Sequence, residues 1–308
     1  MSDYRAVHVP EGLAGERLDA ALARMFGVSR TKAAELIDDG HVTLNSKQPA
    51  RSARVESDDY LEVTFPAERD ALEVRAEVVE GLSVVYDDDD VVVVDKPVGV
   101  AAHPSQGWEG PTVLGGLAGL GYRIATGGAP ERQGIVHRLD VGTSGLMAVA
   151  KSERAYSHIK QQFRDRTVEK IYHTLVHGRL DPLTGTIDAP IARHPHHDFK
   201  FAVMAGGRES VTHYETLEAF AHASLLEVHL ETGRTHQIRV HMSAMRHPCV
   251  GDDMYGADPT LSARLGLVRQ WLHACELEFE HPSSGQRIRL HSDYAPDLQR
   301  ALDLVREL

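Results

Sequence analysis

The chain has 308 residues, 42% of them apolar and 25% charged, a composition typical of a soluble protein with about two domains. Charges and glycines interrupt the first 22 residues, which do not resemble a secretion signal, and the aliphatic run at 91–94 is too short to cross a membrane. The two cysteines, Cys249 and Cys275, form no CxxC pair, so neither a disulfide framework nor a thiolate zinc site is indicated. We therefore expect a cytoplasmic protein with no membrane partner.

The net charge of −12 is concentrated in one stretch of the chain. Residues 56–95 contain 14 acids and two bases, so the remaining residues carry equal numbers of each. Residues 151–170 and 233–247 are locally basic, and the second of these has three arginines, three histidines and no acid. Because attraction to phosphate depends on local potential, the composition leaves a nucleic-acid partner open. The alternative is that these basic stretches are ordinary solvated surfaces whose charges are balanced elsewhere on a globular protein.

The first part of the chain, residues 12–65, is expected to form a small α/β module. Apolar residues with helical spacing begin at Leu18, and Ser29 is a typical N-cap for a second helix that Gly40 ends. The expected elements are two helices, 17–26 and 30–38, and two short strands, 42–45 and 60–63. An acidic connector follows at 66–81, and its interspersed leucine and valines favour an extended conformation.

Strand patterns dominate the second part, residues 82–308. Two helices are expected there, 153–166 and 297–308, each with its apolar residues on one face. Since strands are many and do not alternate regularly with helices, the pattern favours an α+β fold with a mainly antiparallel, mixed sheet and flanking helices. The expected strands are residues 82–86, 91–94, 134–136, 146–150, 171–176, 211–214, 225–230 and 288–290.

Asp140 is the first candidate for chemistry. It lies in a segment, 134–145, that is expected to form a strand, a tight Gly-Thr-Ser-Gly turn and a second strand. This arrangement holds one carboxylate on a stiff support beside a cation, Arg138, and two hydroxyls. Such a carboxylate can act on a sugar carbon or a proton without a metal or cofactor. The alternative is an aspartate that only hydrogen-bonds its own turn.

Three other segments carry polar side chains in unusual patterns. Lys-Pro and His-Pro pairs bracket a glycine at 96–104, which indicates a rigid loop leaving a strand. Tyr172 lies on an alternating strand, where a buried structural tyrosine is the usual outcome. Residues 230–241 read as a strand rich in arginine, histidine and glutamine, a density of planar donors that suits phosphate or carboxylate groups. A solvated basic strand is the alternative.

Together, these segments resemble the RluA/RluD-type pseudouridine synthases over roughly residues 84–305. The first unit is similar to the alpha-L RNA-binding domain that often precedes such enzymes. The matching positions of the second unit are Lys96, Pro97, Gly99, His103 and Pro104; His137, Arg138, Leu139, Asp140, Thr143, Ser144 and Gly145; Lys170 and Tyr172; Thr232, Gly233, Arg234, His236, Gln237, Ile238, Arg239 and His241; and Gly251, Asp252, Tyr255, Gly256, Leu272, His273, Ala274, Phe279, His281 and Pro282.

The resemblance implies isomerisation of a uridine in RNA, in which the N1–C1′ bond breaks and C5 bonds to C1′. Asp140 would be the catalytic carboxylate, either as nucleophile at C1′ or as base on the ribose. Tyr172 would stack on the flipped base and assist C5 deprotonation, and Arg239 would hold Asp140 ionised and oriented. Arg138 would fill the gap that the flipped base leaves. The other expected RNA contacts are His137, Thr143, Arg234 and His236, with Arg17, Arg30, Lys32 and Lys47 in the first unit.

Other function classes fit the sequence less well. A non-catalytic RNA-binding protein would have no reason to keep Asp140, Tyr172 and Arg239 together. A metal-dependent hydrolase would need clustered ligands, but the 19 histidines are scattered, and only the His-rich loop at 193–200 offers a metal-site alternative. We expect no cofactor, no metal and no obligate protein partner. Large-subunit ribosomal RNA is the expected substrate, with transfer RNA as the alternative.

Overall fold

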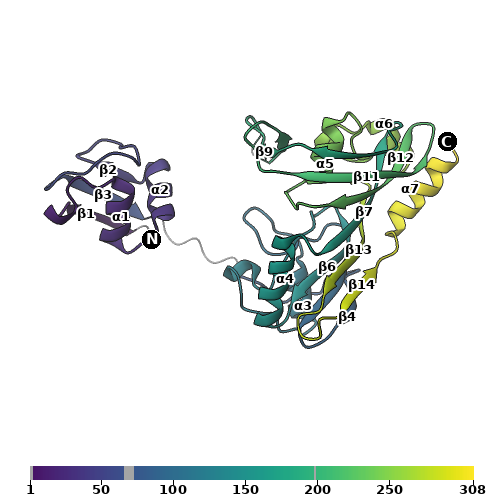
Figure 1. Cartoon of the computed structure of the whole chain (residues 1–308), viewed down its shortest axis with the longest axis horizontal. Coiled ribbons are helices and arrows are strands. Elements are labelled where there is room, and N and C mark those ends of the chain that lie inside the picture. The colour runs from purple at the N-terminus through teal and green to yellow at the C-terminus, as the bar shows by residue number, and fades with distance from the viewer. Residues whose placement is uncertain (1–2, 66–72, 198) are drawn as a thin grey trace. The chain divides into compact units, whose positions relative to one another are not determined.

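The computed structural model describes residues 3–65, 73–197 and 199–308 (Figure 1). It divides the chain into two compact units, Met1–Ala71 and Leu72–Leu308, which are described separately. Within the described residues, no helix combines the length and the apolar character needed to span a membrane.

The first unit has a three-stranded antiparallel sheet and two helices. The expected helices and strands are confirmed, and Ser29 caps the second helix by accepting a hydrogen bond from the Lys32 amide at 3.1 Å. The strand β1, which lies before residue 12, completes the sheet by pairing with β3. Leu18, Leu22 and Leu36 are among the fully buried residues of the core. The elements are β1 (Asp3–His8), α1 (Leu18–Phe26), α2 (Arg30–Asp38), β2 (Val42–Leu44) and β3 (Tyr60–Phe65).

The second unit is built on a nine-stranded mixed sheet. Its strand order is β4-β5-β6-β13-β7-β12-β11-β8, with β14 paired to β13, and only the β13–β6 pair is parallel. The expected fold class is therefore confirmed. The strands are β4 (Ser83–Asp87), β5 (Val91–Lys96), β6 (Ser144–Ala150), β7 (Glu169–His177), β8 (Thr184–Asp188), β11 (Val211–Ala219), β12 (Ala223–Leu230), β13 (Leu272–Glu280) and β14 (Arg287–His291); a separate hairpin joins β9 (Ile191–Arg193) to β10 (Phe201–Val203).

Helices cover both faces of this sheet (Figure 1). Side chains alternate along each strand, so Val92 and Val94 of β5 pack in one core while Val91 and Val93 pack in another. The first core includes α3 and α5, and the opposite face is covered by α4 and by α6 with α7. The helices are α3 (Val113–Gly119), α4 (Glu153–Asp165), α5 (Gln237–Ala244), α6 (Pro259–Arg264) and α7 (Pro296–Arg306).

Two expected strands are wrong. Residues 134–136 form no strand, and only Ile135 makes an isolated bridge, to Val149. The basic segment 230–241 is not a strand either, because β12 ends at Leu230 and α5 begins at Gln237. Since α5 is short and buried on nearly all sides, it lacks the amphipathic period that would have marked it as a helix.

The connector packs on the second unit where it is described. Residues 66–72 lie outside the described residues, and residues 73–82 contain no helix or strand. The Glu77 side chain accepts a hydrogen bond from the Thr112 amide at 2.9 Å, just before α3. A Cβ at Gly119 would lie 2.2 Å from the Glu77 carbonyl oxygen, so a glycine at this position of α3 permits the close approach.

Candidate active site

Asp140 lies in a tight loop just before β6, and several backbone contacts fix that loop. The Thr143 amide donates to the Asp140 carbonyl at 3.0 Å, and the Gly99 amide donates to the Val141 carbonyl at 2.9 Å. Gly145 has a φ of +114°, and a Cβ there would lie 2.3 Å from the Ala274 carbonyl oxygen. A glycine is therefore required where the loop enters β6 beside β13.

Lys96 is buried beneath this loop and ties it to the neighbouring one. Its ammonium group donates to the carbonyl oxygens of Pro97 at 3.0 Å, Val100 at 2.8 Å and Val141 at 3.4 Å. Burial lowers the pKa of Lys96 to about 7, although the nearby Asp140 carboxylate opposes this shift. The Lys-Pro segment is thus a structural support that the sequence pattern correctly placed in a rigid loop.

A chain of buried hydrogen bonds supports the end of the loop from behind. Arg269 donates to the Ser144 hydroxyl at 3.0 Å, and that hydroxyl lies 2.9 Å from Nδ1 of His273. On the other side, Nε2 of His273 lies 3.1 Å from the Ser292 hydroxyl, which donates to Asp95 at 2.6 Å. The Ser144 and Ser292 hydroxyls both have an acceptor in this series of hydrogen bonds only if His273 is neutral, with its proton on Nε2. Burial lowers the pKa of His273 to about 4, which favours that state.

The Asp140 carboxylate faces two nitrogen groups from the segment that begins α5. Its Oδ2 atom lies 3.3 Å from Nη1 of Arg239 and 3.8 Å from Nε2 of His236. The Asp140 side chain is 16% exposed, so it remains accessible from the pocket. Burial acts to lower the pKa of Arg239, but the ion pairs with Asp252 and Asp140 outweigh it and raise the pKa above its usual value. The guanidinium is therefore a permanent cation beside the candidate catalytic group.

Arg239 is itself held by Asp252. Nε and Nη2 of Arg239 donate to the two carboxylate oxygens of Asp252 at 2.6 and 2.9 Å, and both side chains are almost fully buried. The guanidinium also lies 4.9 Å from the centre of the Tyr255 ring. The Tyr255 hydroxyl in turn lies 2.8 Å from Nδ1 of His236. Asp252 and Tyr255 belong to the positions matched by resemblance, but no role for either was expected.

The loop before α5 is fixed by one glutamine. Oε1 of Gln237 accepts hydrogen bonds from the Arg234 amide at 2.9 Å and from the Thr232 hydroxyl at 2.8 Å. Its amide nitrogen donates to the Val211 carbonyl at 3.0 Å. His236, the residue before the helix, adopts a left-handed conformation with a φ of 57°, and burial lowers its pKa despite the nearby Asp140 carboxylate. The segment that reads as a basic strand is therefore a turn that leads into a buried helix.

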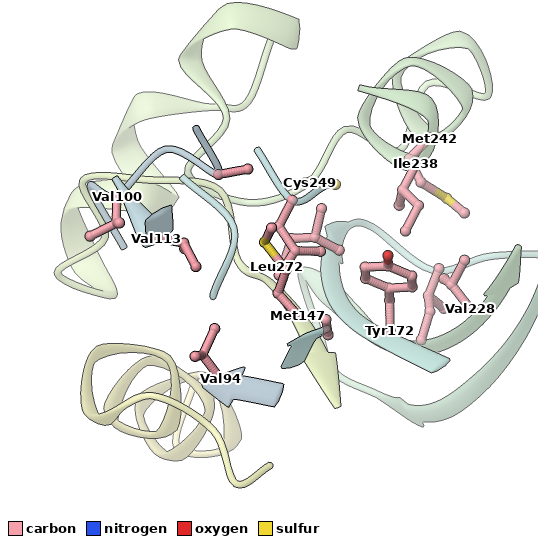
Figure 2. Close-up of a cluster of buried hydrophobic side chains, with 14 of the residues drawn as sticks. Val94, Val100, Val113, Met147, Tyr172, Val228, Ile238, Met242, Cys249 and Leu272 are labelled. Carbon is pink, nitrogen blue, oxygen red and sulfur yellow. The ribbon is translucent and has the colours of Figure 1, made fainter. Parts of the chain in front are cut away.

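Tyr172 contributes another wall of the pocket. Figure 2 shows its ring rising from β7 near Leu272 and Val228, with the hydroxyl oxygen directed toward Ile238 of α5. Burial raises the pKa of Tyr172 well above its usual value, and the Asp140 carboxylate raises it further. The pocket has an empty volume of about 540 Å³, which includes the part that opens to solvent. Its lining includes Arg138, Asp140, Thr143, Tyr172, Arg234, His236, Arg239 and Leu272.

The expected RNA contacts of the second unit have different surroundings. Arg138 is exposed at the pocket, whereas Thr143 is buried and lies 3.4 Å from the Gln270 amide nitrogen. Nε of Arg234 donates to the Glu209 carbonyl at 3.0 Å.

The His137 ring is part of the packing beneath the pocket. Its Nε2 atom accepts a hydrogen bond from the Ala148 amide of β6 at 2.9 Å, and an RNA contact by His137 stays a prediction. Its ring stacks on Phe163, and burial lowers its pKa to about 3.

The expected contacts of the first unit lie within that unit. Arg17 and Arg30 both form ion pairs with Asp19, at 2.9 and 3.2 Å. Lys32 lies 3.8 Å from Glu35, and Lys47 is exposed. The ion pairs neutralise part of the positive charge on this surface.

The His-rich loop between β9 and β10 gathers aromatic rings. The ring centres of His194 and His197 are 4.9 Å apart, and those of His194 and His196 are 6.0 Å apart. Within the described residues, no three His, Cys, Asp or Glu side chains are arranged to hold a metal ion.

Comparison with known proteins agrees with this geometry. A family model described as RNA pseudouridylate synthase matches residues 90–244, and an S4 domain model matches residues 16–48. The chain is 59% identical over 302 residues to an uncharacterized RNA pseudouridine synthase of Mycobacterium bovis, covering 98% of each. It is 40% identical over 320 residues to the ribosomal large subunit pseudouridine synthase D of Pseudomonas aeruginosa, covering 100% of this chain and 98% of that one.

Among solved structures, human RNA pseudouridylate synthase domain containing 1 is similar with a TM-score of 0.58 and 27% sequence identity. The match covers 74% of this chain and 90% of that chain. The chain therefore belongs to the RNA pseudouridylate synthases, isomerases that act on RNA, and carries an RNA-binding S4 domain in its first unit.

Proposed function

We propose that the protein converts specific uridines of large-subunit ribosomal RNA to pseudouridine in the cytoplasm, with Asp140 as the catalytic carboxylate and with no metal or cofactor. The choice of substrate is supported by relatives named ribosomal large subunit pseudouridine synthase D, which are 40% identical over nearly the whole chain. The observation that carries the mechanism is that Asp140 is the only carboxylate among the described residues lining the pocket.

A single carboxylate is sufficient for this reaction. The N1–C1′ bond breaks, the base turns, C5 bonds to C1′, and the hydrogen on C5 leaves as a proton. Because water is not the acceptor of the sugar, no second carboxylate is needed to activate it. Asp140 acts either as a nucleophile at C1′ or as a base on the ribose, and the contact with Arg239 at 3.3 Å orients it in both routes.

The base reaches Asp140 only after leaving its stack, and side chains around the pocket suit that step. Arg138 is exposed and has no carboxylate within ion-pair distance among the described residues, so it is free to enter the gap in the RNA. Tyr172 offers an aromatic face to the flipped base and stays a neutral phenol near neutral pH, since its pKa is raised. As a neutral phenol, Tyr172 would assist loss of the C5 proton through a hydrogen bond of its hydroxyl and not as the base that takes up the proton.

The activity is tested with RNA labelled with tritium at C5 of uridine. Bond formation at C5 expels the label, so we expect wild-type protein to release tritium from unmodified large-subunit ribosomal RNA, in the presence of EDTA as well. Absence of release would contradict the proposed activity on this RNA.

The substrate is tested in cells that lack the protein. Pseudouridine is mapped by chemical modification in ribosomal and transfer RNA from deleted and complemented cells. We expect at least one ribosomal site to disappear and to return on complementation. Loss confined to transfer RNA would overturn the ribosomal assignment and leave the isomerase activity standing.

A further inference from the structure

A second recess adjoins the pocket of Asp140 and shares Arg138, Tyr172 and Arg234 with it. Its walls come from the C-terminal end of α4, the start of β7 and the loop that follows β12. Phe163 and Lys170 line it from the side of α4 and β7. A nucleotide in the Asp140 pocket would therefore have its neighbouring backbone next to this recess.

Lys170 is a largely buried cation that no carboxylate compensates. Its ammonium group lies 5.5 Å from the centre of the Phe163 ring, and no described carboxylate lies within ion-pair distance of it. Burial lowers the pKa of Lys170 to about 8, so the group is mostly charged at neutral pH. Taking a cation out of water without a counter-ion is unfavourable, and one aromatic contact offsets only part of that penalty. An anion in the recess would supply the missing partner.

Of the other cations around the recess, only Arg166 has carboxylate partners in the part of the chain that the structure describes. Arg166 binds Glu209 at 2.9 Å and Glu231 at 3.2 Å, and Glu231, the one acid that lines the recess, also lies 2.7 Å from Nε2 of His213. Arg164 donates to the Gln161 side chain at 2.6 Å. Among the described residues that line the recess, Arg138, Arg164 and Arg234 also have no carboxylate within ion-pair distance, but Arg234 donates to the Glu209 carbonyl at 3.0 Å, and Arg138 and Arg164 are exposed to water.

The spacing of Lys170 and Tyr172 along β7 determines how far Lys170 lies from a base that is held at Tyr172. The two residues are separated by one residue on β7, so they share a face of the strand about 6.6 Å apart. That spacing suits a base at Tyr172 and a phosphate of the adjoining backbone at Lys170. We propose that Lys170 binds a backbone phosphate of the RNA beside the flipped nucleotide. This inference rests on the proposed function, because it takes the flipped base to lie at Tyr172.

A lysine that only packs on an aromatic ring is available in the same protein for comparison. Lys160 on α4 lies 4.7 Å from the centre of the Tyr156 ring, donates to its hydroxyl at 2.9 Å, and is exposed. Lys160 does not line the recess. Lys160→Met is therefore a matched control for Lys170→Met, and Lys170→Arg tests whether the charge alone is needed.

The experiment measures binding of the full chain to unmodified large-subunit ribosomal RNA over a range of salt concentrations, together with single-turnover tritium release. For Lys170→Met we expect about tenfold weaker binding and a salt slope smaller in magnitude by about 0.7–0.9, the contribution of one phosphate contact. The rate at saturating protein should change by less than about threefold. Lys170→Arg should recover most of the affinity, and Lys160→Met should match wild type.

The possible results separate the phosphate contact from its alternatives. An unchanged salt slope in Lys170→Met, or a loss confined to the saturated rate, would overturn the inference, because either result assigns Lys170 to packing around Tyr172. If wild type releases tritium and Lys170→Met binds normally, the proposed function stands and the phosphate site fails. If wild type releases none but the slope falls in Lys170→Met, the phosphate contact stands and the proposed function fails.

Discussion

Asp252→Asn tests whether the Arg239–Asp252 pair positions the catalytic carboxylate. Both oxygens of Asp252 accept from Arg239, at 2.6 and 2.9 Å, whereas the contact to Asp140 is longer, at 3.3 Å. Asparagine keeps one acceptor and turns an amide N–H group toward a guanidinium N–H group. Arg239 then has Asp140 as its only carboxylate partner at this site, and the guanidinium shifts toward it.

The size of the effect follows from the burial of the pair. Losing one charge-assisted hydrogen bond costs about 1.5–3 kcal/mol, and breaking a buried ion pair costs about 3–5 kcal/mol. Because Asp140 still compensates Arg239, we expect Asp252→Asn to lower the free energy of unfolding of the second unit by about 3 kcal/mol. A displacement of about 1 Å at a reacting group lowers the rate by about 100-fold. We therefore expect the single-turnover rate to fall by about 10- to 100-fold.

Two readouts separate these effects. The only tryptophans, Trp108 and Trp271, lie in the second unit, so denaturant unfolding followed by tryptophan fluorescence reports on that unit alone. Tritium release under single-turnover conditions reports on the chemistry. Asp253→Asn, at an exposed neighbouring position, is the control and should behave as wild type. Wild-type stability and rate in Asp252→Asn would refute the role of this ion pair.

Three further predictions concern other parts of the site. Arg138→Ala should keep the unfolding midpoint within experimental error but slow single-turnover tritium release, since the exposed side chain supports base flipping; an unchanged rate would exclude that role. Tyr172→Phe should bind RNA within about twofold of wild type but turn over more slowly, because the ring is kept and the hydroxyl is lost; equal rates would show that the hydroxyl takes no part. The folded-state pKa of His273, about 4, lies below its ordinary value of 6.5, so the unfolded chain binds more protons between these values and stability falls as the pH falls through that window. In denaturant titrations over this pH window, the free energy of unfolding of His273→Gln should therefore change by up to about 1.4 kcal/mol per pH unit less than that of wild type. The same pH dependence in both proteins would contradict a buried, neutral His273.

The sequence predicted the elements whose burial follows a simple period. Ser29 marked the start of α2, and alternating or continuous aliphatic residues marked β5, β6 and β12. The pattern missed α5 because this short helix is buried on nearly all sides, so that Ile238 and Val240 read as an alternating strand. It also missed α3, because that helix contains glycines that allow the connector to pack closely against it.

The composition of the site was only partly predictable. Asp140, Tyr172 and Arg239 come from three distant segments, and the resemblance named all three before the structure placed them around one pocket. The sequence assigned no role to Asp252, because a lone acid after a glycine has no local signature of an ion pair with a residue on a neighbouring helix. The burial of Lys170 was equally unpredictable from the sequence, since it arises, with the absence of a carboxylate partner, from packing between α4 and β7.

The central claim is that the Asp140 carboxylate performs the chemistry, and Asp140→Asn tests it most directly. Purified variant and wild type are incubated with tritium-labelled, unmodified large-subunit ribosomal RNA and EDTA, and both release of tritium and RNA binding are measured. We predict that Asp140→Asn binds this RNA and folds as wild type does, yet releases no tritium above background. Appreciable turnover by Asp140→Asn would contradict the account.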